Sequence, residues 1–211
     1  MHTTIFLVRN AQTAWNDERR LAGRRELGLS EQGRATAAAL VVRFAGVELG
    51  EILTSPLPRA VETAQPLAAG LGLDVARDPR LIDWQPGRWE GRTYAEIAVE
   101  PLYATLMSGP PADAVFPDGD RLLDVRNRMR SAVAQALQDN ELGSSIALVS
   151  HAGPLRLLLA HYLSIAASDH TRLRLEPGSV TVLRFTQVDR PPELIAINVC
   201  GRVLDSLKVA R

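Results

Sequence analysis

Short apolar runs alternate along this chain with longer segments of helical character, and this alternation restricts the fold more than any other feature. Five runs have the length and the apolar content of buried strands: residues 3–8, 51–54, 145–149, 180–185 and 194–199. The pair Pro191-Pro192 separates the last two runs and predicts a turn between them.

Four segments have helical patterns: residues 33–44, from Ser55-Pro56 towards Gly70 or Gly72, 124–138 and 154–163. Ser30 is a candidate N-cap for the first of these helices, and Pro66 is a position where the second can kink. Repeated strand–helix alternation predicts an α/β fold. We expect a single domain over residues 1–211, with a mostly parallel central sheet and helices on both faces.

The composition argues against several functional classes. The 211 residues are 46% apolar and 23% charged, with zero net charge, which argues against a nucleic-acid partner bound through its phosphates. The chain has one cysteine, no apolar run of membrane-spanning length and no signal-like start. We therefore expect a cytoplasmic protein without a membrane partner, either a monomer or a homodimer.

Residues 92–121 interrupt the alternating pattern, and we predict that they form an insertion. They include six residues that break helices and strands: Pro101, Gly109, Pro110, Pro111, Pro117 and Gly119. They also include five apolar or aromatic residues: Tyr94, Tyr103, Leu106, Met107 and Phe116. Such a stretch is typical of a partly helical flap packed on the main body. It is also compatible with a lid above a pocket.

Polar and charged residues follow the predicted strands. Arg9 and Asn10 follow the first strand, and a guanidinium binds phosphate bidentately at any working pH. Arg59 lies in the first turn of a helix, where positive charge is favourable when an anion is held there with the helix amides. His151 also lies between a strand and the start of a helix. Together these positions indicate a phosphate site.

These segments resemble the histidine phosphatase (phosphoglycerate mutase-like) superfamily, and the short 92–121 stretch resembles its phosphatase branch. Arg9-Asn10-Ala11 stands where the family has Arg-His-Gly, and Arg20-Leu21-Ala22-Gly23 where it has Arg-x-Gln-Gly. Gly119-Asp120-Arg121 stands where Gly-Glu-Ser is common. The resemblance implies that the ligand is a small phosphorylated molecule and that no cofactor or metal is needed.

The resemblance also assigns roles. Arg9, Arg59 and His151 would hold the phosphoryl oxygens, and Asp83 would be the general acid, where Glu is the more usual occupant. The resemblance further implies that the phosphate or the substrate is contacted by Asn16, Ala22, Gly23 and Ala152. Glu90 would be structural, hydrogen-bonded within its own turn.

Asn10 replaces the histidine that the family uses as nucleophile. An amide nitrogen is a poor nucleophile because its lone pair is delocalised into the carbonyl. Three interpretations follow: an inactivated variant of a metal-independent phosphomonoester hydrolase, a natural pseudo-phosphatase that binds or senses a phosphorylated metabolite or protein, or a scaffold. A phosphoglycerate mutase fits less well, because those members are typically longer. Sugar phosphates, phosphoglycerates, α-ribazole-type nucleotide phosphates and phosphorylated amino acids all remain open as ligands.

Overall fold

The computed structural model describes residues 2–103, 114–187 and 190–209. Its six strands form one sheet: β1 (Thr3–Arg9), β2 (Glu51–Thr54), β3 (Val75–Arg77), β4 (Ser145–Ser150), β5 (Val180–Phe185) and β6 (Glu193–Val199). Their order in the sheet is β3-β2-β4-β1-β5-β6. β1, β2, β3 and β4 run parallel, and β5 runs antiparallel to both of its neighbours. The predicted α/β fold with a mostly parallel sheet is therefore confirmed.

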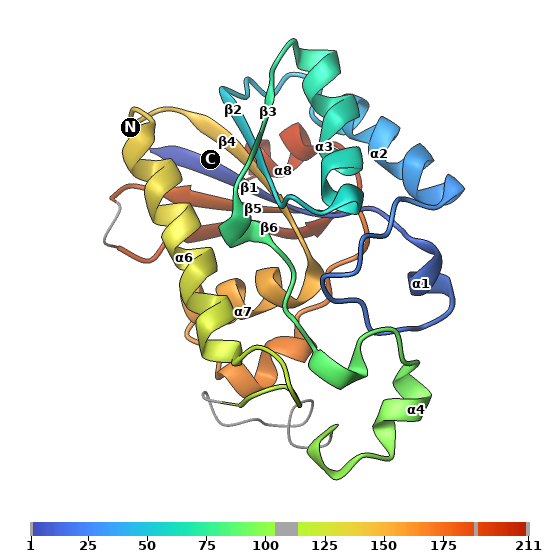
Figure 1. Ribbon diagram of the computed structural model, residues 1–211. Coiled ribbons are helices and arrows are strands. Elements are labelled where there is room, and N and C mark those ends of the chain that lie inside the picture. The colour runs from blue at the N-terminus through green and yellow to red at the C-terminus, as the bar shows by residue number, and fades with distance from the viewer. Residues whose placement is uncertain (1, 104–113, 188–189, 210–211) are drawn as a thin grey trace.

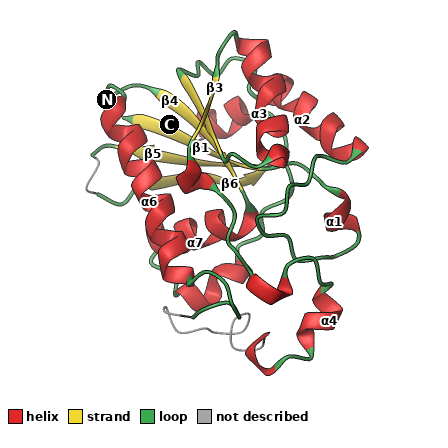
Figure 2. Ribbon diagram, viewed as in Figure 1, coloured by secondary structure: helices red, strands yellow, loops and turns green. Residues whose placement is uncertain are grey.

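In the described part of the chain, helices cover both faces of this sheet, and two short ones lie beyond one of its ends (Figure 1 and Figure 2). They are α1 (Ala14–Asp17), α2 (Glu31–Arg43), α3 (Pro58–Leu71), α4 (Tyr94–Ala98), α6 (Leu122–Asp139), α7 (Ala152–Tyr162) and α8 (Val203–Val209). The described residues also form three short 3-10 helices: η1 (Pro79–Leu81), η2 (Gly87–Trp89) and η3 (Ala167–Arg172). Figure 1 shows α6 and α7 over one face, with α2, α3 and α8 on the other.

The strand pleat directs alternate side chains of β1 into two cores. Ile5 and Leu7 pack into a cluster with residues of α6 and α7. Phe6 and Val8 pack into a second cluster with residues of α2 and α3. All four side chains are at most 1% exposed. A strand buried on both faces reads as a continuous apolar run, which is why the sequence pattern identified it.

Several element ends differ from the sequence prediction. β1 continues to Arg9, and the helix expected from Ser55-Pro56 begins at Pro58, where a proline is tolerated because its missing N–H is not needed. Pro66 lies inside this helix, which continues to Leu71 and ends at Gly72 with a φ of 68°. Glycine adopts this left-handed conformation without the strain of a side chain.

The turns after β1 and β4 place their residues at one end of the sheet. Figure 2 shows α1 and α4, with the loops that lead to each of them, beyond this end. In the parts of the chain that the structure describes, no helix combines the length and the apolar character needed to cross a membrane.

Candidate functional site

A pocket lies where β1 and β4 end side by side. The two strands are parallel neighbours, with Arg9 paired to Ser150, and the Asn10 N–H donates to the Ser150 carbonyl at 2.8 Å. The residues that follow the two strands, Asn10 and His151, are therefore brought together. Eight of the nine predicted site residues line the pocket: Arg9, Asn10, Asn16, Ala22, Arg59, Asp83, His151 and Ala152.

Asn10 is buried and both atoms of its amide group have neighbours. Its Nδ2 donates to the Ala11 carbonyl at 2.8 Å, and its Oδ1 lies 3.1 Å from Nδ1 of His151. The Ala11 N–H donates to Oγ1 of Thr63 on α3 at 2.9 Å. The loop after β1 is thus held from two sides, and Asn10 has a defined orientation.

His151 is the N-cap residue of α7 and is only 1% exposed. Its Nε2 lies 2.8 Å from Oγ of Ser55, and its Nδ1 lies 3.2 Å from Nε of Arg59. Burial, reinforced by Arg59 and two further arginines, lowers the pKa of His151 well below its usual value. The imidazole is therefore neutral at neutral pH.

Arg59 and Asp83 form a buried ion pair. Their side chains are 2% and 8% exposed, and Nη2 of Arg59 donates to Oδ2 of Asp83 at 2.9 Å. Arg59 also donates to the carbonyls of Gly23 and Arg25, at 2.6 and 2.9 Å. Burial raises the pKa of Asp83 to about 6, although Arg59 opposes the shift. This carboxyl group can therefore exchange a proton near neutral pH, as a general acid requires.

The backbone on both sides of Asp83 is fixed by distant elements. Arg128 of α6 donates to the carbonyls of Asp83 and Arg80, at 3.0 and 2.7 Å. The Asp120 N–H donates to the Gln85 carbonyl at 2.8 Å, and the Gln85 N–H donates to Oδ2 of Asp120 at 3.0 Å. The acid segment is thus attached to α6 and to the end of the 92–121 stretch.

Arg9 is a partly buried cation with few partners. Its Nη1 donates to the Leu175 carbonyl, and its Nε has no hydrogen-bond partner among the described residues. It forms no ion pair within the described part of the chain. Burial and the nearby Arg156 lower the pKa of Arg9 to about 10, so it remains charged at neutral pH. A cation that is partly removed from water without a counterion is unfavourable, which makes this wall of the pocket attractive to an anion.

The remaining predicted residues differ in their surroundings. Oδ1 of Asn16 accepts from the Thr13 N–H at 2.8 Å, so its amide N–H groups are the part that can serve a ligand. Gly23 does not line the pocket, but its carbonyl holds Arg59. A Cβ at Gly23 would lie 2.3 Å from Cδ of Pro86, so the close approach there requires glycine.

Other contacts were not predicted from the sequence. Ser55 contacts His151 but was singled out only as part of a motif, because one serine before a helix carries no signal of its own. Tyr94 and Arg20 line the pocket without having been assigned to it. The expectation for Glu90 was wrong in its detail: its Oε1 accepts from the Arg25 N–H at 3.0 Å, outside its own turn.

The described part of the 92–121 stretch packs on the main body. Ile97 and Phe116 are buried in one cluster with Trp84 and Trp89. Tyr94, the first residue of α4, also lines the pocket. The predicted apolar residues Leu106 and Met107 lie outside the described residues. Whether this stretch moves as a lid stays a prediction.

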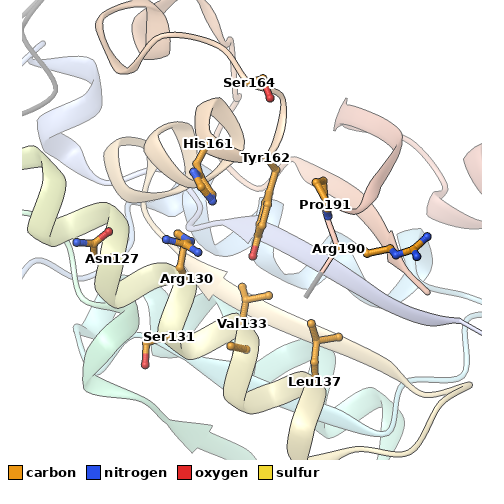
Figure 3. A pocket seen from close by; sticks show the side chains of 11 residues that line it. Asn127, Arg130, Ser131, Val133, Leu137, His161, Tyr162, Ser164, Arg190 and Pro191 are labelled. Carbon is orange, nitrogen blue, oxygen red and sulfur yellow. The ribbon is translucent and has the colours of Figure 1, made fainter. Parts of the chain in front are cut away.

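A larger hollow of about 490 Å³ lies between α6 and the C-terminal end of α7 (Figure 3). It contains none of the predicted site residues, and its polar side chains on α6 are exposed: Asn127, Arg130 and Ser131. The pocket at the strand ends combines buried charge with an unpaired cation, so we take it as the candidate site. Among the described residues, no cluster of three or more His, Cys, Asp or Glu residues could hold a metal ion.

Comparison with known proteins shows one family over most of the chain. The model of the histidine phosphatase superfamily (branch 1) matches residues 5–198. A probable phosphoglycerate mutase GpmB of Cronobacter sakazakii is 34% identical over 185 residues, which are 87% of this chain and 85% of that protein.

Solved structures agree with this match. A mycobacterial glucosyl-3-phosphoglycerate phosphatase has a TM-score of 0.84 and 26% identity, covering 94% of this chain and 100% of the other. The YhfR protein of Bacillus stearothermophilus has a TM-score of 0.82 and 30% identity, covering 93% and 96% of the two chains.

Proposed function

Because this chain belongs to branch 1 of the histidine phosphatase superfamily, we propose that it binds phosphomonoesters in the pocket at the ends of β1 and β4 without a metal ion. With Asn10 in the place of the nucleophile, it turns them over little or not at all. The ligand is a small phosphorylated molecule.

The observation that carries this proposal is Arg9, a partly buried cation whose buried Nε has no hydrogen-bond partner among the described residues. Arg9 and Arg59 line the same pocket, where Asp83 is the one acidic side chain among the lining residues described. Arg59 already has that carboxylate as its partner. A phosphoryl group would supply the negative charge that Arg9 lacks, and its oxygens would accept from the unpartnered Nε. The N-terminus of α7, at Ala152, adds further positive potential on the same side.

The contacts of Asn10 also indicate what a histidine would do there. Nδ2 of Asn10 donates to the Ala11 carbonyl, and Nδ1 of an imidazole at this position could donate the same hydrogen bond. That bond would fix the tautomer and leave Nε2 unprotonated, available to attack phosphorus.

The catalytic sequence we propose for a chain with His at position 10 has two steps. Nε2 forms a bond to phosphorus while the ester P–O bond breaks, and the departing alcohol takes a proton from Asp83. The Asp83 carboxylate then takes a proton from water as its oxygen attacks the phosphohistidine, which releases phosphate and restores the imidazole. Arg9, Arg59 and His151 hold the equatorial oxygens throughout. The pKa of Asp83, raised to about 6 by burial, supports both roles.

One observation favours the alternative of a pseudo-phosphatase that binds or senses its ligand. Asn10 is accommodated with both amide atoms engaged, at 2.8 and 3.1 Å, so the pocket holds this residue in a single orientation. A phosphate-binding protein without turnover would also keep Arg9 and Arg59.

The test compares this chain with its Asn10→His variant. Both are assayed against p-nitrophenyl phosphate and a panel of phosphomonoesters in the presence of EDTA, and inorganic phosphate binding is measured by calorimetry. We expect both chains to bind phosphate and the histidine variant alone to turn over substrate, faster by several orders of magnitude.

Asn10→Ala serves as the matched control, since it also removes the amide but adds no nucleophile. If the histidine variant binds phosphate yet stays inert, the pseudo-phosphatase alternative holds. If neither chain binds phosphate or its esters, the proposed function is wrong.

A further inference from the structure

Ser55 lies behind the catalytic pocket, at the residue that follows β2. Its side chain is fully buried, and its Oγ lies 2.8 Å from Nε2 of His151. The same oxygen already accepts from the Leu57 N–H at 3.3 Å. No role in the proposed reaction requires this hydroxyl group.

The hydroxyl hydrogen of Ser55 needs an acceptor. Within the described part of the chain, the one acceptor recorded beside Oγ is Nε2 of His151. A buried O–H without an acceptor costs the full desolvation penalty of that group. Ser55 therefore donates to Nε2, which must carry a lone pair. In a neutral imidazole, the proton then lies on Nδ1.

Nδ1 has two recorded contacts, of which one supports a proton on this atom and the other opposes it. Oδ1 of Asn10, at 3.1 Å, is a suitable acceptor for an Nδ1–H group. The Nε–H group of Arg59 donates to Nδ1 at 3.2 Å, and this contact favours a lone pair there. The opposite tautomer satisfies that one contact, but it leaves the Ser55 hydroxyl hydrogen without an acceptor and places Oδ1 of Asn10 against a lone pair. Turning the amide of Asn10 would place that oxygen against the Ala11 carbonyl instead.

We propose that Ser55 is a positioning residue that holds neutral His151 in its Nδ1–H tautomer, so that His151 directs an N–H donor into the pocket. An oxygen of a bound anion would accept from this group, in place of Oδ1 of Asn10. His151 thus donates to the anion without having to be protonated, in agreement with a pKa far below its usual value. The part of this inference that concerns the anion rests on the proposed function, whereas the tautomer does not.

The tautomer can be measured directly in this chain. Long-range proton–nitrogen correlation spectra of 15N-labelled protein distinguish the two neutral imidazole forms, and His151→Gln identifies the His151 signals among those of the four histidines. We expect an unprotonated Nε2 and a protonated Nδ1. A protonated Nε2 overturns the proposal, whatever the protein binds.

The Ser55→Ala variant tests the role of the hydroxyl group. We expect its His151 to shift towards the Nε2–H form and inorganic phosphate binding to weaken about three- to tenfold. Ser55→Thr, which restores a hydroxyl group, should return both readouts towards those of the parent.

Ser150→Ala is the matched control. Ser150 is also a fully buried serine at a strand end, but its hydroxyl donates to the Leu81 carbonyl at 2.8 Å rather than to His151. This variant should lose stability without a change of tautomer. If Ser55→Ala keeps the parent tautomer, the proposal fails. If the parent tautomer is as expected but phosphate does not bind, the positioning role stands and the proposed function falls.

Discussion

Arg9 is the residue where ligand binding and folding stability make opposite demands. A partly buried cation without a counterion destabilises the empty protein, whereas the same charge attracts a phosphate ester. Its Nη1 contact with the Leu175 carbonyl keeps the side chain at the pocket rather than in solvent.

The Arg9→Gln variant should therefore bind inorganic phosphate about 10- to 100-fold more weakly, because a charge-assisted hydrogen bond is lost. Its midpoint of thermal unfolding without ligand should be equal to or above that of the parent. Calorimetric titration and thermal denaturation measure the two effects. Arg9→Lys, which keeps the charge, is the control and should lose less affinity. A large drop in both affinity and stability would contradict this account of Arg9.

The sequence alone identified the charged residues of the pocket, but it did not identify the residues that hold them in position. Arg9, Arg59 and His151 carry signals because arginine and histidine at strand ends or helix starts indicate anion binding. Ser55 and Arg128 carry no such signal. Their contacts with His151 and with the Asp83 backbone depend on how separate elements pack together, which the sequence pattern does not specify.

Among the helices and strands, the close packing of α7 on the segment that carries Asp83 depends on Gly153. A Cβ at Gly153 would lie 2.5 Å from Cζ3 of Trp84, so the first turn of α7 rests directly on the ring of the residue next to Asp83. The helix start that forms one side of the pocket and the segment that carries the acid are therefore packed as one unit.

Gly153→Ala should destabilise the fold by about 1–3 kcal/mol through overpacking and should also weaken phosphate binding. Urea denaturation and calorimetric titration check the two results. Gly201→Ala is the control, because a Cβ there meets nothing within 4 Å. Unchanged stability in Gly153→Ala would show that the Trp84 contact is looser than the structure indicates.

Apart from the four-residue β2, the elements that the sequence predicted are those with longer, regular patterns. α6 and the two-sided core of β1 follow from apolar periodicity alone. β3 was missed because three residues, of which Ala76 and Arg77 are exposed, are too few to form a pattern. Predicted helix starts were displaced by two or three residues where prolines and capping residues crowd together, as at Pro58.

For the whole molecule, Asp83 links folding stability to pH. Its pKa, about 6 in the folded protein against an ordinary value of 3.8, means that the folded state binds more protons than the unfolded state between these values. The free energy of unfolding therefore falls as the pH rises through this window, and the contribution is fully lost above pH 6.

We expect the difference in unfolding free energy between the parent and Asp83→Asn to decline from pH 4 to pH 7. At its steepest point, the slope of this difference against pH should correspond to a difference of about one bound proton between the folded and unfolded states. Chemical denaturation of both proteins at several pH values gives this difference and cancels the contributions of other groups. A difference that grows with pH would mean that the ion pair with Arg59 outweighs burial.

The hydrogen bonds between Gln85 and Asp120 hold the segment that carries Asp83 from outside residues 104–113. The acid segment is held by contacts on either side of residues 104–113, through Asp120 on one side and the Trp89 cluster on the other. These contacts, together with those of Arg128, lie outside residues 104–113. We therefore expect a change in the length of that interval to leave Asp83 in place, so that the part of the chain above the pocket can vary independently of the acid.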